Sequence, residues 1–355
     1  MISKKGIDYS IDRLLILLGE QQQDNGSFST KFYQPIYNPT YGWMTLGDSC
    51  FDSASIIIPL LHIESSRSRS IIEKTISYVQ GQGFEGKLWS YPTLNEWYLH
   101  FHDTDSTALC SFVLEQNGVK CDNKKLLNQL STNGHYLVFV DSFLHMKNLS
   151  LSAQFNLWRY NRKVKKSLAY ANNLLRETDL DFVVSCNNLL YLGGKFWDSA
   201  VWMNAVRSFE NKSFQQTYYP SIMNSVHAFA RLVYLRKDDH NLELSGVTEY
   251  MEKMYSELNP SDFFLDKILF ASSVLYLGLE VEKFQSVFQE CFAEIDSERF
   301  MRNAALYSCN LKTDLQPDGK SPNTYFGSPA ITCSLYLEFL NLYRKRVYYS
   351  YYGEC

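Results

Sequence analysis

Hydrophobic residues recur along much of the chain at intervals of three and four positions, which is the spacing of an amphipathic helix. Alternation of the strand type is scarce, and its best example, residues 136–140, is short. No proline- or glycine-rich stretch divides the chain, so we expect a single domain over residues 1–355. The pattern predicts an all-α protein, with its clearest helices over residues 11–18, 53–61, 71–79, 108–116 and 330–343.

A polar turn that contains glycine precedes several of the predicted helices. The examples are residues 21–28 before a helix at Asp52, residues 80–89 before a helix at Ser106, and residues 316–319 before a helix at Ser328. Such recurrence is typical of helix pairs that bury their faces only against neighbouring pairs. About six pairs fit a chain of 355 residues.

Composition narrows the class of protein. Lys and Arg (34) nearly balance Asp and Glu (38), which argues against a nucleic-acid partner. Eight scattered cysteines without a Cys-x-x-Cys pair indicate reduced thiols in a cytoplasmic protein. The first apolar run, residues 14–18, is too short for a signal peptide or a transmembrane segment. The 25 Tyr, 23 Phe and 6 Trp either fill a thick core or line a cavity.

Four short motifs follow one another within residues 95–159. They are HDTDSTAL at 102–109, LEQNG at 114–118, NGHYLVF at 133–139 and AQFNLWR at 153–159. Their order and spacing resemble those of class II terpene cyclases, which start a reaction by protonating an alkene. In that family a D-x-D-D-T-A helix start precedes a Leu and a Gly on the same helix, then a glycine turn and an N-L-Y-R helix.

The resemblance implies a fold and a reaction. It favours a closed (α/α)6 toroid, a ring of six helix pairs, over an open solenoid. The enzyme would be a terpenoid cyclase acting on a linear prenyl diphosphate, either farnesyl or geranylgeranyl diphosphate. Its cyclic product, of drimane or labdane type, would keep the diphosphate. No aspartate-rich DDxxD cluster, which would ionise the diphosphate, is present in the sequence.

The resemblance also assigns roles to the residues of the first motif. Asp105 corresponds to the proton donor, and Asp103 to the residue that hydrogen-bonds and tunes it. Ser106 stands where most members of the family have a third Asp. The chemistry is reasonable on its own, because burial and a neighbouring carboxylate both raise the pKa of an Asp and keep it protonated.

Residues near the motifs are candidates for substrate binding. Aromatic faces stabilise a carbocation, by about 2 kcal/mol or more each when water is excluded. Arg159 begins a basic helical face, with Arg162, Lys163 and Lys166, that suits a diphosphate. The candidates are His102, Trp89, Tyr91, Trp97, Trp158 and Arg159.

Each of these features has a simpler structural explanation. Asp-Thr-Asp-Ser-Thr over residues 103–107 is ordinary helix-capping composition, since short oxygen-bearing side chains satisfy the first free amides of a helix. Isolated aromatic residues are more often part of a core than of a cavity wall. A basic run is usually a solvated face.

The resemblance also implies a metal ion and partner subunits. The family implies that Mg²⁺ binds with the substrate diphosphate, although the sequence shows no carboxylate cluster for it, and we predict no metal site formed by the protein. Family members usually place the active site between two toroids, and this chain has room for one. We therefore expect the pocket to be closed by a homodimer or by a second cyclase or phosphatase subunit, or to be the central cavity of this chain.

Two other functions stay open. One is a non-catalytic toroid that serves as a binding scaffold. The other is a zinc-dependent subunit similar to the β subunit of protein prenyltransferases, since Asp48-Ser49-Cys50 resembles the Asp-x-Cys part of that zinc site. No third ligand matches at the expected place, so Cys50 is predicted to be a buried thiol at a helix start.

Overall fold

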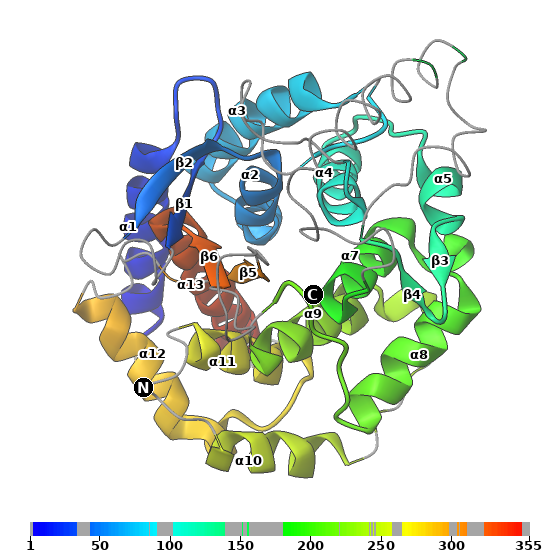
Figure 1. The fold of residues 1–355 in the computed structure, drawn as a ribbon. Helices are drawn as coiled ribbons and strands as arrows, with labels where there is room; N and C mark the ends of the chain where they lie inside the picture. Colours follow the sequence, from blue (N-terminus) through cyan, green and yellow to red (C-terminus); the bar gives the residue numbers. More distant parts are fainter. Residues whose placement is uncertain are drawn as a thin grey trace, which may run out of the picture.

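The computed structural model describes most of the chain. The described residues are 3–33, 43–84, 86–90, 102–138, 151, 155, 180–219, 221–240, 242, 244, 246–257, 265–297, 304, 306–310 and 323–349. Within them lie twelve α-helices and six short strands. The predicted α/α toroid is confirmed, because the helices form two concentric layers (Figure 1).

The inner layer is a closed ring. Each inner helix contacts the next one along the chain, and the last contacts the first. The inner helices are α2 (Cys50–Ile57), α4 (Thr104–Gln116), α7 (Phe182–Leu192), α9 (Ile222–Leu235), α11 (Asp266–Tyr276) and α13 (Pro329–Arg344). The outer helices are α1 (Lys4–Gln21), α3 (Ser66–Gln82), α5 (Lys124–Asn128), α8 (Ser199–Glu210), α10 (Val247–Glu257) and α12 (Gln285–Asp296) (Figure 1).

The inner helices are largely buried on all sides and the outer helices on one face, as their patterns of hydrophobic residues require. Every residue of α7 is buried, and so are residues 330–343 of α13, because these helices lie between the outer layer and the centre of the ring. The outer helix α8 buries only one face, as an amphipathic surface helix does. The five stretches predicted from periodicity fall in α1, α2 with the following 3-10 turn, α3, α4 and α13.

Short polar side chains start most of the inner helices. Ser49, Asp103, Asp181, Ser221 and Ser328 each accept a hydrogen bond from a backbone amide in the first turn of α2, α4, α7, α9 and α13. These caps satisfy amides that have no partner inside the helix. The recurrent turn-and-helix pattern of the sequence thus marks where the chain enters the inner ring.

A four-stranded antiparallel sheet is an element that the periodicity did not predict. Its order is β2 (Met44–Asp48), β1 (Ser29–Tyr33), β6 (Asn323–Gly327) and β5 (Tyr307–Asn310). The central pair, β1 and β6, joins the two ends of the ring. The remaining elements are β3 (Ser131–Thr132), β4 (His135–Tyr136), the 3-10 turns Pro59–His62, Gly194–Phe196, Lys237–Asp239 and Val281–Phe284, and a π-turn, Lys345–Tyr349.

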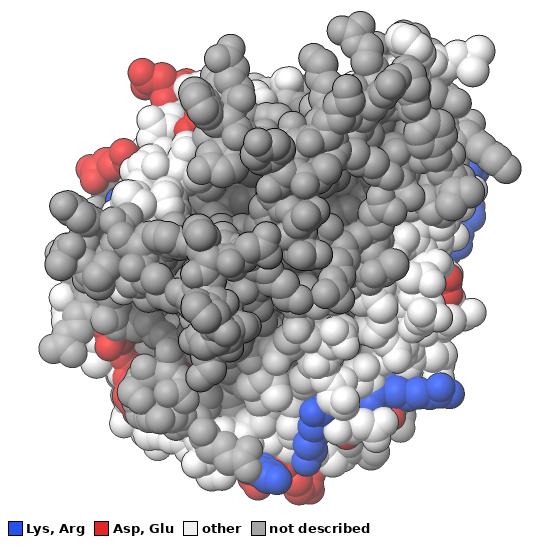
Figure 2. Space-filling view, in the orientation of Figure 1, with Lys and Arg blue, Asp and Glu red and all other residues white. Residues whose placement is uncertain are grey.

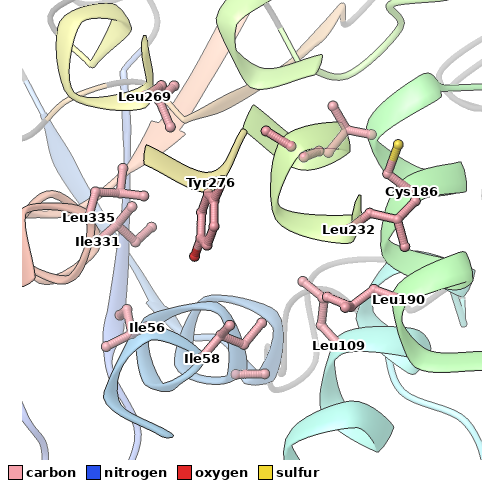
Figure 3. Packing of buried hydrophobic residues seen from close by; sticks show 14 of the residues in the cluster. Ile56, Ile58, Leu109, Cys186, Leu190, Leu232, Leu269, Tyr276, Ile331 and Leu335 are labelled. Atoms are coloured by element: carbon pink, nitrogen blue, oxygen red, sulfur yellow. The ribbon is translucent and has the colours of Figure 1, made fainter. Parts of the chain in front are cut away.

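The core continues through the ring. Figure 3 shows Ile56 of α2, Leu109 of α4, and Ile331 and Leu335 of α13 around Tyr276, which projects from α11 into the space between them. All of these side chains are buried. The described side chains therefore fill much of the centre, and any cavity there is bounded by all six inner helices.

The described surface carries mixed charge. In the view of Figure 2, basic and acidic side chains both lie around the rim of the ring, with uncharged residues between them. Several are paired, for example Lys283 with Glu252 at 3.1 Å and Lys267 with Glu290. None of the helices in the described ranges combines the length and the apolarity needed to cross a membrane.

Gly26 fixes the turn between α1 and β1, and its replacement should be costly. Its φ is +89°, and a Cβ there would lie 2.2 Å from the backbone oxygen of Lys74 in α3. We expect Gly26→Ala to lower the free energy of unfolding by about 3 kcal/mol, because left-handed strain adds to a clash with backbone.

Gly118→Ala is the matched control for that substitution. Its φ is +79°, and a Cβ there meets nothing within 4 Å. It should therefore show the conformational cost alone, about 1 kcal/mol. Urea unfolding of both variants measures the difference, and equal losses would show that the contact with α3 is not a tight one.

Candidate active site

The first turn of α4 carries the two aspartates of the motif. The carboxylate of Asp103 caps the helix, with Oδ1 2.5 Å from the backbone nitrogen of Ser106. Thr104 anchors the same turn from the other side, through its backbone amide to Val138 and its hydroxyl to the Leu137 carbonyl at 2.6 Å. Asp105 is the second residue of the helix and is buried, with 7% of its surface exposed.

Each oxygen of Asp105 accepts one hydrogen bond, the first from α7 and the second from the segment that precedes α9. Asn187 of α7 donates to Oδ1 from Nδ2 at 2.8 Å, and the Tyr219 hydroxyl donates to Oδ2 at 2.6 Å. Arg231 of α9 donates from Nη2 to the Asn187 oxygen at 3.0 Å. Because Arg231 takes that oxygen, the amide of Asn187 must turn its NH₂ toward Asp105.

These surroundings make Asp105 a weak acid with a well-stabilised anion. Burial raises the pKa of Asp105 to about 6, while the hydrogen bonds from Tyr219 and Asn187 lower it, the charge of Asp181 raises it and that of Arg231 lowers it. A carboxyl with this pKa is still partly protonated near neutral pH. Once it loses its proton, Asn187 and Tyr219 are already placed to hold the carboxylate.

Asp181 positions the segment that carries Tyr219. Its Oδ1 accepts hydrogen bonds from the amides of Val183 and Val184 at the start of α7. Its Oδ2 accepts from the amides of Thr217 and Tyr218, at 2.8 and 2.9 Å. One buried carboxylate thereby joins the start of α7 to the residues that precede Tyr219.

A small cavity lies next to the two residues that donate to this acid, although Asp105 itself is not among the residues that line it. Its volume is about 50 Å³, room for a few water molecules. Asn187 and Tyr219, the two donors to Asp105, line it, and so does Leu109, one turn further along α4. Pockets for small molecules usually measure roughly 300 Å³ or more, so a prenyl chain must displace lining side chains to enter.

A second buried polar cluster borders the same cavity. His227 and Arg231, one turn apart on α9, both line it. Nε2 of His227 lies 2.8 Å from Oε2 of Glu338, and the Tyr276 hydroxyl donates to the other oxygen of Glu338. Glu338 is 3% exposed, so this hydrogen-bonded pair lies in the interior.

Two motif residues, Asp103 and Ser106, are not among the hydrogen-bond partners of Asp105. The resemblance assigns Asp103 to tuning Asp105, but its carboxylate caps α4, and the donors to Asp105 are Asn187 and Tyr219. The hydroxyl of Ser106 is buried and has no hydrogen-bond partner among the described residues. It therefore takes no part in the contacts of Asp105.

The two described candidates for substrate binding lie outside the cavity lining. Trp89 is fully buried, and its indole nitrogen donates to the Val79 carbonyl at 2.8 Å. His102 is half-buried, with Nδ1 2.7 Å from the Ser90 hydroxyl. Both side chains are part of the packing around α3 and α4. The other candidates, Tyr91, Trp97, Trp158 and Arg159, fall outside the described residues.

The partners of Asp105 were not predicted from the sequence. Asn187, Tyr219 and Arg231 lie far along the chain from the motif, and no local spacing links them to it. The one available signal was the helical start at residues 181–184, where Asp181 is followed by an apolar run. The ring closure, rather than any motif, brings these residues to Asp105.

A second aspartate has nearly the same electrostatic setting. Asp52 lies in the first turn of α2 and is fully buried. Burial raises its pKa to about 6, although the hydrogen bonds from Thr30 and Tyr307 lower it. Unlike the partners of Asp105, neither Thr30 nor Tyr307 lines the cavity. Asp52 joins the sheet to α2, and it provides a control for experiments on Asp105.

The predicted character of Cys50 is confirmed. It is fully buried at the first position of α2, and its Sγ donates to the Ser90 carbonyl. Among the described residues there is no group of three His, Cys, Asp or Glu side chains that could hold a metal ion. The carboxyl oxygens beside the cavity, those of Asp105 and Glu338, are already hydrogen-bonded. This donor set does not fit a protein-bound Mg²⁺.

The ring architecture is the fold of type II terpene cyclases. A variant of the cyclase MstE from Scytonema, in complex with its substrate geranylgeranyl dihydroxybenzoate, matches with a TM-score of 0.66 at 11% identity. The match covers 96% of this chain and 98% of that chain. MstE with its product merosterolic acid A matches with a TM-score of 0.64 at 11% identity, over 96% and 98% of the two chains.

A protein from Actinoplanes is similar to the same degree. It has a TM-score of 0.64 at 10% identity, and the match covers 95% of this chain and 99% of that one. No protein-family model and no curated protein matches the sequence. At these identities the structural likeness establishes the fold.

Proposed function

We propose that the chain is a class II terpenoid cyclase in which Asp105 protonates the terminal alkene of a linear isoprenoid. The observation that carries the proposal is a carboxyl group that burial keeps partly protonated and that is hydrogen-bonded to two residues lining a cavity, within a toroid of the type II cyclase fold. General acids work best when their pKa lies near the working pH.

The surrounding residues support each part of the protonation step. Arg231 fixes the amide of Asn187, so that Oδ1 of Asp105 always accepts and the acidic proton resides on Oδ2. The proton passes from Oδ2 to the alkene carbon, and the resulting cation is attacked by the next double bond of the chain. The carboxylate that remains is stabilised by Asn187 and Tyr219.

The substrate in this proposal is a prenyl diphosphate, farnesyl or geranylgeranyl diphosphate, cyclised to a drimane- or labdane-type product that keeps its diphosphate. Mg²⁺ would enter with the diphosphate rather than through a protein site, and no step depends on it. Incubation of the purified protein with each diphosphate, followed by dephosphorylation and gas chromatography, tests this substrate class. A cyclic alcohol is the expected product.

A second substrate class is favoured by the comparison with MstE, which binds geranylgeranyl dihydroxybenzoate. A prenylated aromatic acid presents the same terminal alkene to Asp105, with a carboxylate in place of the diphosphate. The same incubation with a geranylgeranylated hydroxybenzoate distinguishes the two. Two other results would favour the alternative functions. If the protein cyclises neither substrate class but retains a partner in a pull-down experiment, it is a binding scaffold. If it binds about one zinc ion per chain, it is a prenyltransferase-like subunit.

The proposal places the active site within a single chain. It therefore needs neither the homodimer nor the second cyclase or phosphatase subunit expected from two-toroid relatives. Light scattering of the active protein tests this point. Activity that appears only above the concentration of dimer formation would show that a second copy contributes to the site.

The rate of cyclisation should fall as the pH rises through about 6. Only the protonated form of Asp105 is active, and burial holds its pKa at about 6, so about one molecule in ten is competent at pH 7. We expect kcat/KM to fall about tenfold per pH unit above the pKa. Circular dichroism over the same range controls for unfolding, and a flat or rising profile would contradict the assignment.

A further inference from the structure

A buried histidine borders the cavity and takes no part in the protonation step. His227 lies in the second turn of α9 and is 5% exposed. It lines the cavity together with Arg231, which lies one turn further along the same helix. Arg231 in turn bonds Asn187, the partner of Asp105. The histidine and the group of residues bonded to the acid therefore meet on one face of α9, at the wall of the same cavity.

Glu338 determines which nitrogen of His227 is free. Burial alone would raise the pKa of Glu338, but the charge that His227 carries when it is protonated and the hydrogen bond from His227, together with Arg231 and Tyr276, hold that pKa below its usual value. The carboxylate is thus ionised and accepts, so the hydrogen of a neutral imidazole must lie on Nε2. Among the described residues, Glu338 is the one hydrogen-bond partner of the ring, which leaves Nδ1 with a lone pair.

We propose that His227 is the base that ends the cyclisation, with Glu338 as the residue that positions it. This inference rests on the proposed function. In the final step a C–H bond beside the cationic carbon breaks, and its electron pair becomes the new double bond. The proton moves to Nδ1 of His227. The imidazolium formed is neutralised by Glu338, and it loses its proton to solvent when the product leaves, while Asp105 takes one up.

The other groups beside the cavity are less suited to this step. Arg231 keeps its proton at any working pH. Both oxygens of Glu338 already accept hydrogen bonds, from His227 and Tyr276. Each ring closure moves the cation along the substrate, away from the end that received the proton. A base on α9 can therefore meet the final cation where Asp105 on α4 does not.

The substitution His227→Gln tests the inference. Its amide keeps a donor for Glu338, so the buried carboxylate stays paired, but it has no basic nitrogen. We expect substrate consumption within about tenfold of the wild type, with the share of the wild-type alkene reduced by about 10²-fold in favour of isomeric alkenes or a water-quenched alcohol. His135→Gln is the control, because His135 is a half-buried histidine that does not line the cavity.

Two results would overturn the inference: an unchanged product, or loss of consumption in the variant, since the base acts only after protonation. A wild type that cyclises no substrate would instead refute the proposed function. If His227→Gln does not fold, long-range ¹H–¹⁵N spectra of the wild-type histidines decide. Nδ1 of His227 should show the shift of an unprotonated nitrogen and Nε2 that of a protonated one, and the reverse or a doubly protonated ring would overturn the assignment.

Discussion

Asp105→Asn should reduce cyclisation by about 10³-fold or more while leaving the fold intact. The amide has nearly the same shape as the carboxyl group, and the hydroxyl of Tyr219 can rotate to accept from its NH₂. What the variant lacks is an acidic proton. The measurement is the rate of product formation with whichever substrate the wild type cyclises, alongside thermal unfolding of both proteins.

Asp52→Asn is the matched control for that prediction. Asp52 is also buried, its pKa is raised to about 6 for the same reason, and it also accepts a hydrogen bond from a tyrosine hydroxyl, that of Tyr307. Its hydrogen-bond partners do not line the cavity, so the same substitution should change the rate by less than about threefold. Comparable losses in the two variants would mean that burial of an aspartate, rather than its place beside the cavity, governs activity.

Asp181→Ala should lower the free energy of unfolding by about 3–5 kcal/mol. Four backbone amides, two in α7 and two in the segment before Tyr219, lose a buried acceptor, and each unsatisfied amide costs about 1–3 kcal/mol before the structure relaxes. Cyclisation should fall as well, because Tyr219 is no longer held against Asp105. Chemical denaturation gives the first quantity and the product assay the second.

Asp198→Ala separates the tie to Tyr219 from ordinary helix capping. Asp198 caps the outer helix α8, and its Oδ1 accepts from Ala200 and Val201 at 2.8 and 3.4 Å, the same distances as from Asp181 to Val183 and Val184. It is half-buried, and its other oxygen accepts from the Ser131 hydroxyl in β3, so we expect a loss of about 1–2 kcal/mol and full activity. Similar losses of stability and activity in both variants would contradict the role given to Asp181.

The fold was largely predictable because its signal is local. Helical spacing located α1, α2, α3, α4 and α13, and the recurrent polar turns reflect the capping residues that start the inner helices. The sheet was missed because its central pairing joins strands from the two ends of the chain, near Lys31 and Gly327. Short strands of this kind gain their stability from pairing with neighbouring strands, and no periodic pattern in the sequence indicates them.

The site was predictable only as far as its motif reaches. The resemblance selected Asp105, which the structure places in the first turn of an inner helix. Residue type alone could not show that Trp89 faces α3 rather than the cavity, because aromatic side chains serve both purposes equally well. Nor could it find Asn187, Tyr219 and His227, which reach the cavity through the closure of the ring.

Deuterium incorporation tests the central claim most directly. Every route in which a buried carboxyl starts the reaction delivers one hydrogen from solvent to the substrate, because Asp105 exchanges its proton with water between turnovers. Cyclisation in D₂O should therefore give a product that carries one deuterium at the carbon of the former terminal alkene and retains its head group. A cyclic product without deuterium, or one that has lost its head group, would contradict initiation by Asp105.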